Sequence, residues 1–108
     1  MGTTIADPVV RKGSQIQATP LYNVVLLDDN DHTYEYVIEM VKKLFACSQA
    51  AAWNHAVEVD KTGRTIVVTC ELPLAEFGRD QILAYGADPR MPRSKGSMSA
   101  IVEPASQK

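Results

Sequence analysis

Hydrophobic positions recur with two different spacings after residue 20, and these spacings predict three strands and three helices. Residues 22–27 (YNVVLL) form a short apolar run that stops at consecutive Asp and Asn residues, which predicts a buried strand ending in a turn. Residues 65–70 (TIVVTC) and 98–102 (MSAIV) predict two more strands, because the first is rich in β-branched side chains and the second alternates apolar with small polar ones.

Two helices are predicted between the first and second strands. Apolar residues recur at helical spacing through 34–45, with acidic residues near the start and lysines near the end, which complements the helix dipole. Asp31 or Thr33 is expected to cap this helix. Ser48 is expected to cap an alanine-rich second helix, which ends near a turn at 60–63.

A third helix is predicted to begin near Pro73, because proline suits a first helical turn, and to stop at Gly86. Its large apolar side chains are expected to face the core: Leu74, Phe77, Ile82 and Leu83. Residues 87–96 contain two prolines and three bases and predict a loop. We expect these bases to be solvated, with contact to an acidic partner as the alternative: Arg90, Arg93 and Lys95.

The order strand, helix, helix, strand, helix, strand predicts an α/β (α+β) fold. We expect a small two-layer sandwich in which three helices cover one face of a three-stranded sheet. Hydrophobic residues in 1–20 follow neither the two-residue period of a strand nor the 3.6-residue period of a helix, so this segment is expected to form a flexible arm. The domain is then expected to occupy 21–105, with a tail at 106–108.

Composition narrows the class of protein. A chain of 108 residues, 45% of them hydrophobic, fits one domain, and a net charge of −2 lacks the basic field of non-specific nucleic-acid binding. The first twenty residues lack the apolar run of a secretory signal, and no stretch predicts a membrane span, so we expect a cytoplasmic protein without a membrane partner. Cys47 and Cys70 lack metal-binding or redox spacing and are expected to stay reduced.

The acidic turn at 28–32 (DDNDH) is the densest group of chemically active side chains. Carboxylates at a strand end can pair with a cation, cap a helix, bind a metal or act as acid and base. From residue type alone, a solvated turn that also caps the next helix is as good an interpretation as a binding site.

Metal-binding and catalytic motifs fit this turn poorly. A calcium loop that starts at Asp28 would put His32 fifth and Thr33 sixth, where the sharp turn needs glycine. No Ser or Cys has a credible base, no glycine-rich phosphate loop is present, and the histidines lack ligand spacing. We therefore expect no enzyme, metal or cofactor, and we expect Trp53 to pack and His55 to be a surface or satisfied core residue.

Several segments taken together resemble the ClpS family, the adaptor of the ATP-dependent Clp protease. The likeness extends over nearly all of 21–105 and needs no gap through the first two predicted helices. The segments that carry it are YNVVLLDDN at 22–30, YEYVI at 34–38, KLF at 43–45, AE at 75–76 and the strand at 98–105.

The resemblance implies a binding adaptor that holds protein N-termini with a bulky apolar first residue (N-degrons). It implies delivery to a Clp AAA+ unfoldase, ClpA- or ClpC-like, through that enzyme's N-terminal domain. The implied amine-binding residues are Asp28, Asp29 and Asp60. The implied side-chain pocket comprises His32, Tyr34, Val37, Ala56, Val59 and Met98, and the implied unfoldase interface comprises Glu76 and Arg79. The alternative is a ClpS-like domain that docks on and regulates an unfoldase without binding N-degrons.

Some positions depart from the family's pattern. Tyr34 stands where a flexible Met is usual, Ala56 replaces a large apolar residue, and Gly78 replaces a common Lys. Asp28 falls where an Asn is usual, and Asp60 replaces an amine-binding His. The resemblance therefore implies an unusually anionic amine site, in which the acids can accept from an ammonium group or repel one another.

Overall fold

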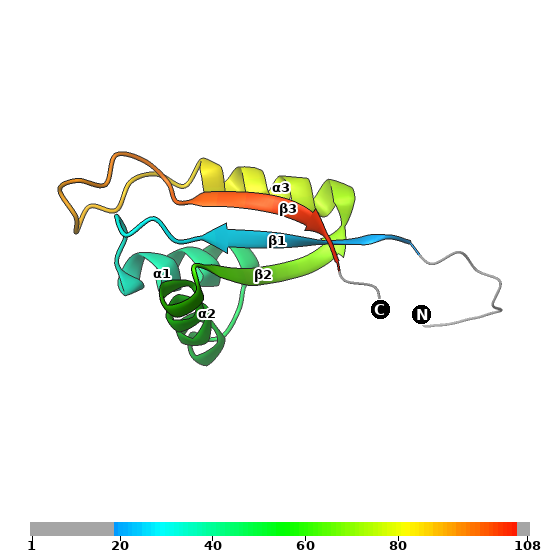
Figure 1. Ribbon diagram of the computed structural model, residues 1–108, viewed down its shortest axis with the longest axis horizontal. Helices are drawn as coiled ribbons and strands as arrows, with labels where there is room; N and C mark the ends of the chain where they lie inside the picture. The colour runs from blue at the N-terminus through cyan, green and yellow to red at the C-terminus, as the bar shows by residue number, and fades with distance from the viewer. Residues whose placement is uncertain (1–18, 106–108) are drawn as a thin grey trace.

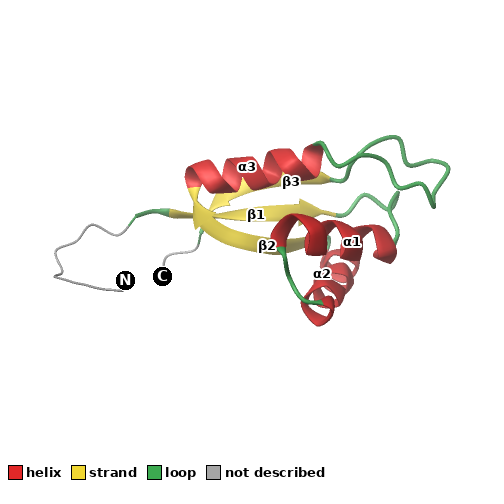
Figure 2. Ribbon diagram, turned by 180° about the vertical axis from the view of Figure 1, so that it is seen from behind, coloured by secondary structure: helices red, strands yellow, loops and turns green. Residues whose placement is uncertain are grey.

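The computed structural model describes residues 19–105 and confirms the predicted α+β class. The three strands form one antiparallel sheet in the order β2-β1-β3. The elements are β1 (Leu21–Leu27), α1 (Tyr34–Phe45), α2 (Gln49–Thr62), β2 (Arg64–Glu71), α3 (Leu72–Leu83) and β3 (Ser99–Pro104). Figure 2 shows α1 and α3 in front of the sheet, with α2 behind α1 beside the β2 edge, whereas Figure 1 shows the sheet from the opposite side.

The expected arm lies outside the described residues except for its last two positions, and so does the expected tail at 106–108. No helix within 19–105 is long and apolar enough to cross a membrane.

Alternation along the strands divides the sheet into an apolar face and a partly polar one. Val24, Leu26 and Ala100 belong to the buried cluster that the helices cover. On the open face, Glu103 accepts hydrogen bonds from Arg64 at 2.6 Å and from Asn23 at 3.2 Å. An antiparallel sheet can keep one face partly solvated in this way, so most of the core lies on the side of Val24 and Leu26, while Val25 is also fully buried on the other side.

Both predicted helix caps are observed. The side chain of Thr33 accepts from the backbone N–H of Tyr36, and Ser48 caps α2 in the same manner. The second helix ends within the predicted range 60–63: its last turn includes Asp60, and Gly63 ends it in the left-handed region at φ 90°. Asp60 is therefore fixed on a helix and not carried by a turn.

The prediction for the core face of α3 was wrong for three of its four residues. The exposed side chains are Leu74 (62%), Phe77 (62%) and Leu83 (49%). Small residues face the sheet instead and leave Ile82 as the only large one in the buried stripe, which comprises Ala75, Gly78 and Ile82. A methyl group on Gly78 would lie 3.1 Å from the ring of Phe45, so a small residue is what lets the helix approach this closely.

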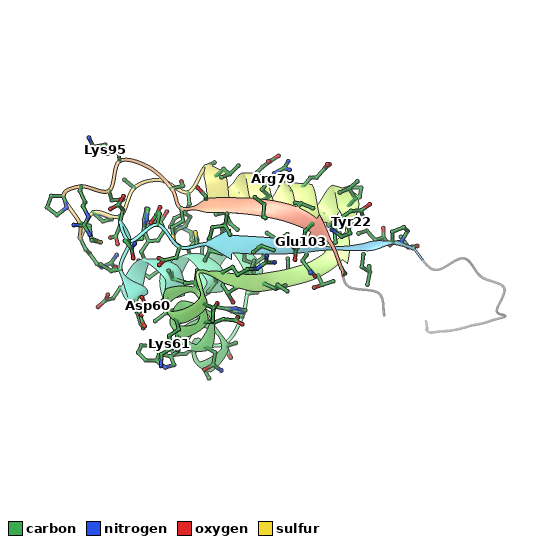
Figure 3. All side chains as sticks on the ribbon, viewed as in Figure 1. Tyr22, Asp60, Lys61, Arg79, Lys95 and Glu103 are labelled. Carbon is green, nitrogen blue, oxygen red and sulfur yellow. The ribbon has the colours of Figure 1, made fainter. Side chains whose placement is uncertain are left out.

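The loop before β3 is bound to the rest of the chain and not simply solvated as expected. Arg90 pairs with Glu39 of α1 at 2.5 Å, and Arg93 pairs with Asp31 at 2.8 Å. The third base, Lys95, is exposed and projects from this loop (Figure 3). Two of the three bases therefore serve internal ion pairs, for which the sequence pattern gives no direct signal.

Candidate functional site

The predicted amine-binding residues lie where β1 leaves the sheet beside the end of α2. The backbone N–H of Asp28 donates to the carbonyl of Gly63 at 3.0 Å, which joins the acidic turn to the helix that carries Asp60. Asp60 lies at the opposite end of the sheet from Tyr22, and Arg79 lies well away on α3 (Figure 3).

Tyr34 connects the acids of this region. Its hydroxyl donates to Oδ2 of Asp60 at 2.6 Å, from the first turn of α1 to the last turn of α2. The hydrogen bond to Asp60 is the main reason that the pKa of Tyr34 is raised, with smaller contributions from burial and from the charges of Asp60 and Asp28. Asp28 and Asp60 thus both act on the same hydroxyl.

Trp53 packs against Tyr34, as expected, but it does so at the surface and not in the core. The two ring centroids are 5.3 Å apart in an edge-on arrangement, and Trp53 is 49% exposed. Trp53 lies seven residues before Asp60 on the same face of α2, so the indole, Tyr34 and Asp60 form an aromatic border along this helix. The expectation for His55 is confirmed, since Nδ1 lies 2.8 Å from the hydroxyl of Thr65.

Asp29 is directed away from this pair. Its Oδ1 accepts from the backbone N–H of Asp31 at 3.0 Å and lies 2.8 Å from Nδ1 of His32. The His32 side chain is 3% exposed, and its Nε2 lies 2.7 Å from the carbonyl of Gly96. Asp29 nevertheless keeps 32% of its side chain exposed beside a polar hollow of about 320 Å³.

Four of the predicted pocket residues belong to the buried core in this conformation. Their exposed fractions are Val37 3%, Ala56 0%, Val59 2% and Met98 1%. Tyr34 is partly buried and packs against this same cluster. The structure therefore places these predicted pocket residues together in the packed core. A ligand side chain can enter between them only if Tyr34 at the surface moves.

Asp88 is an important residue that the sequence interpretation missed. It is 1% exposed and accepts hydrogen bonds from the backbone N–H and hydroxyl of Thr33 and from Arg90. Burial by itself raises the pKa of Asp88, but these hydrogen bonds outweigh it and leave the pKa below its ordinary value. The only available signal was a single acid inside a loop with three bases.

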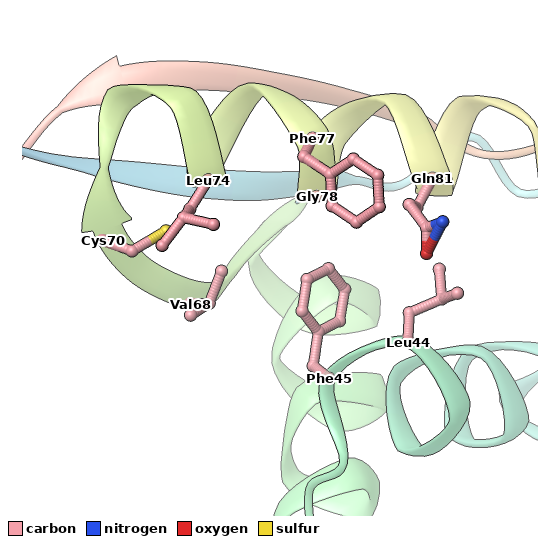
Figure 4. A pocket seen from close by; sticks show the side chains of 8 residues that line it. All are labelled: Leu44, Phe45, Val68, Cys70, Leu74, Phe77, Gly78 and Gln81. Atoms are coloured by element: carbon pink, nitrogen blue, oxygen red, sulfur yellow. The ribbon is translucent and has the colours of Figure 1, made fainter.

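The outer side of α3 forms an apolar surface around a hollow of about 230 Å³ (Figure 4). Phe77 faces Phe45 of α1 across this hollow, and Leu74 lies over Val68 and Cys70 of β2. Of the two predicted interface residues on the same helix, Glu76 is exposed, and Arg79 pairs with its neighbour Asp80 at 3.0 Å.

Metal chemistry finds no support within the described part of the chain. No group of three or more His, Cys, Asp or Glu side chains among residues 19–105 is placed to hold a metal ion. Both cysteines are free thiols of intermediate exposure.

Comparison with known proteins assigns the family. The family described as "ATP-dependent Clp protease adaptor protein ClpS" matches residues 17–92. The ClpS adapter protein of Nautilia profundicola is 36% identical over 59 residues, which cover 55% of this chain and 61% of that protein. ClpS 2 of Rhizobium meliloti is 26% identical over 78 residues, which cover 72% of this chain and 77% of that protein.

A solved structure shows the same fold. It is Agrobacterium tumefaciens ClpS2 bound to L-phenylalaninamide, which matches with a TM-score of 0.69 and 25% sequence identity. The match covers 82% of this chain and 100% of that one.

The protein is a small α+β domain. Its candidate site, which includes Tyr34 and Asp60, lies where β1 ends beside α1 and α2. The chain belongs to the ClpS family, whose members are adaptors of the ATP-dependent Clp protease and not catalytic proteases.

Proposed function

We propose that this protein is an adaptor that binds protein N-termini with a bulky apolar first residue and delivers them to a Clp AAA+ unfoldase. The observation that carries the proposal is the group formed by Tyr34, Asp60 and Asp28 above a buried apolar cluster. The structural neighbour, ClpS2, binds a ligand that combines an α-amino group with a benzyl side chain, which is the same pairing of chemistries. In this role the protein binds and hands over substrates and catalyses no reaction.

The acids suit a charged chain terminus. A free α-amino group has a pKa of about 7.7–8.0 and is largely cationic at neutral pH, whereas an internal peptide N–H is neutral. Charged hydrogen bonds to fixed carboxylates therefore favour a terminus over any internal residue. In this proposal Asp28 and Asp60 accept from the ammonium group, and Asp29, whose carboxylate is directed toward Asp31 and His32, contributes its negative charge from the same turn.

The apolar cluster suits the first side chain. Burial of one Leu- or Phe-sized side chain contributes about 1.5–3 kcal/mol, enough to separate bulky from small first residues. The walls are those implied by the resemblance: His32, Tyr34, Val37, Ala56, Val59 and Met98. These residues are closely packed without ligand, so entry of a side chain requires Tyr34 to move.

The unfoldase contact is proposed for the exposed side of α3. Glu76 and Arg79 lie on the same helix as the apolar surface around Phe77. This helix is remote from Asp60 (Figure 3), so one adaptor can hold a substrate and the N-terminal domain of a ClpA- or ClpC-like unfoldase together.

A second function keeps the fold but omits the ligand. The domain would dock on an unfoldase and regulate it without binding N-termini. The observation that favours it is the close packing of the predicted pocket. Four of its residues are at most 3% exposed: Val37, Ala56, Val59 and Met98.

Peptides that differ only in their first residue, each in free and acetylated form, separate the two functions. The proposal expects saturable binding of free Leu, Phe, Tyr and Trp termini, no binding of acetylated forms, and weaker binding by Asp29→Ala. Recovery of a Clp unfoldase in a pull-down, with no peptide bound, would select the second function instead.

A further inference from the structure

We propose that the Tyr34 hydroxyl is a latch on Asp60, which every N-terminus has to open before it binds. This inference rests on the proposed function. It adds a constant free-energy cost to binding, because the hydrogen bond has to break before any N-terminus binds. This cost follows from one contact, the 2.6 Å hydrogen bond between the Tyr34 hydroxyl and Oδ2 of Asp60.

The contact closes the border between two helices. Tyr34 comes from the first turn of α1 and Asp60 from the last turn of α2, so the hydrogen bond spans the point where a chain terminus would approach. Trp53 contacts the ring of Tyr34 edge-on at 5.3 Å, and the core cluster packs against the ring as well. The closed position of Tyr34 is therefore defined by its ring and by its hydroxyl.

The same side chain is free to leave. Tyr34 is only partly buried, whereas Tyr36 in the same helix is 2% exposed and is held by Gly86 through its hydroxyl. Rotation of Tyr34 toward solvent breaks one hydrogen bond, one ring contact and the packing of the ring against the core cluster, and it requires no movement of the helix backbone. This makes Tyr34 the movable element of the pair.

An ammonium group is a suitable competitor for the hydroxyl. The phenol of Tyr34 is protonated at neutral pH, as in any tyrosine, and donates to Asp60, so this Asp60 oxygen is occupied in the free protein. The phenol of Tyr34 is a neutral donor, whereas the ammonium group brings a full positive charge and several N–H donors to the same carboxylate, so a bound terminus displaces the hydroxyl.

The latch predicts a quantitative signature. If a ligand binds only the open form, its apparent affinity is its intrinsic affinity multiplied by the fraction of the protein that is open. This fraction is the same for every ligand. One net hydrogen bond corresponds to a factor of about two to ten in affinity. A hydroxyl that contacted the ligand directly would instead strengthen binding.

Titration of Tyr34→Phe with three free peptides beginning with Leu, Phe and Trp tests this signature. The latch predicts that Tyr34→Phe binds all three more tightly than the unmodified chain, by one common factor of about two to ten. Tyr22→Phe removes the same atom at the other end of the sheet (Figure 3) and should leave all three affinities unchanged. Unchanged, weakened or peptide-dependent affinities in Tyr34→Phe would overturn the latch and leave the proposed function intact. If neither the unmodified chain nor either variant binds any of the peptides, both the latch and the proposed function are wrong.

Fluorescence provides a second test without ligand, because Trp53 is the only tryptophan of the chain. Breaking the latch with Asp60→Ala frees the ring of Tyr34 and should change the emission of Trp53. In a Tyr34→Phe background the latch is already absent, so Asp60→Ala should add no further change. An equal change in both backgrounds would contradict the latch.

Discussion

The carboxylate of Asp88 accepts two hydrogen bonds from Thr33, at 2.7 Å from its backbone N–H and 2.8 Å from its hydroxyl. Thr33 in turn caps α1 by accepting from Tyr36 at 3.1 Å. The loop before β3 therefore holds the first turn of α1, which carries Tyr34. A buried loop acid thus fixes the helix end that borders the candidate site.

Asp88→Ala should destabilise the fold by about 1–3 kcal/mol, because it leaves buried donors of Thr33 and Arg90 without their acceptor. Chemical denaturation at neutral pH measures this loss. Asp80→Ala is a matched control, since the Asp80 side chain is 65% exposed and pairs only with Arg79 among the described residues. Equal stability of the two variants would show that the Asp88 contacts do not support the fold.

The contribution of Asp88 should also depend on pH. Its pKa is lower in the folded chain than its ordinary value, so its stabilisation is fully present above about pH 4–5 and is lost as pH falls through the folded-state pKa. The stability difference between the unmodified chain and Asp88→Asn should therefore shrink on acidification. Denaturation midpoints from neutral to acid pH measure it, and a difference that grows toward acid pH would contradict the assigned direction.

The charge of Asp60 should be visible in the titration of Tyr34. The hydrogen bond to Asp60 is the largest cause of the raised pKa of Tyr34, followed by burial and by Coulombic effects of Asp60 and Asp28. Asp60→Asn should therefore lower the pKa of Tyr34. The ultraviolet absorbance of tyrosinate, with the signal of Tyr34→Phe subtracted, isolates this group. The same pKa in both proteins would mean that Asp60 does not hold the hydroxyl in solution.

The two sides of α3 should respond differently to truncation. Ile82 is fully buried, so Ile82→Ala should cost about 2–5 kcal/mol in stability. Phe77 is 62% exposed, so Phe77→Ala should cost much less while it weakens any contact made through the apolar surface. Thermal or urea unfolding compares the two variants. A larger loss for Phe77→Ala would contradict the observed orientation of α3.

Much of the fold was predictable because its signals are local. The apolar run of β1, the spacing of α1 and the caps Thr33 and Ser48 each depend on neighbours in the sequence. The face of α3 was not predictable in this way, because Gly78 approaches Phe45 and Val24 of other elements. Large apolar side chains were assigned to the core when close packing required small ones.

The candidate site was predictable in composition but not in arrangement. The acids of the turn were singled out from their residue types, and Tyr34 and Asp60 only through the resemblance, whereas the hydrogen bond from Tyr34 to Asp60 was not foreseen. That contact depends on the last turn of α2 including Asp60, within the range 60–63 where the end of the helix was predicted. Asp88 was missed because its partner Thr33 lies 55 residues away in the sequence.

The most direct measurement is an NMR titration of the isotope-labelled chain with L-phenylalaninamide and with its N-acetylated form. The two ligands share the benzyl side chain and differ in the charge of the amine, so the pair isolates the role of the acids. We predict saturable shifts of the amide signals of Val37, Val59 and Asp60 with the free amine and none with the acetylated ligand. Equal shifts with both ligands, or none with either, would contradict the proposal that this site binds N-termini.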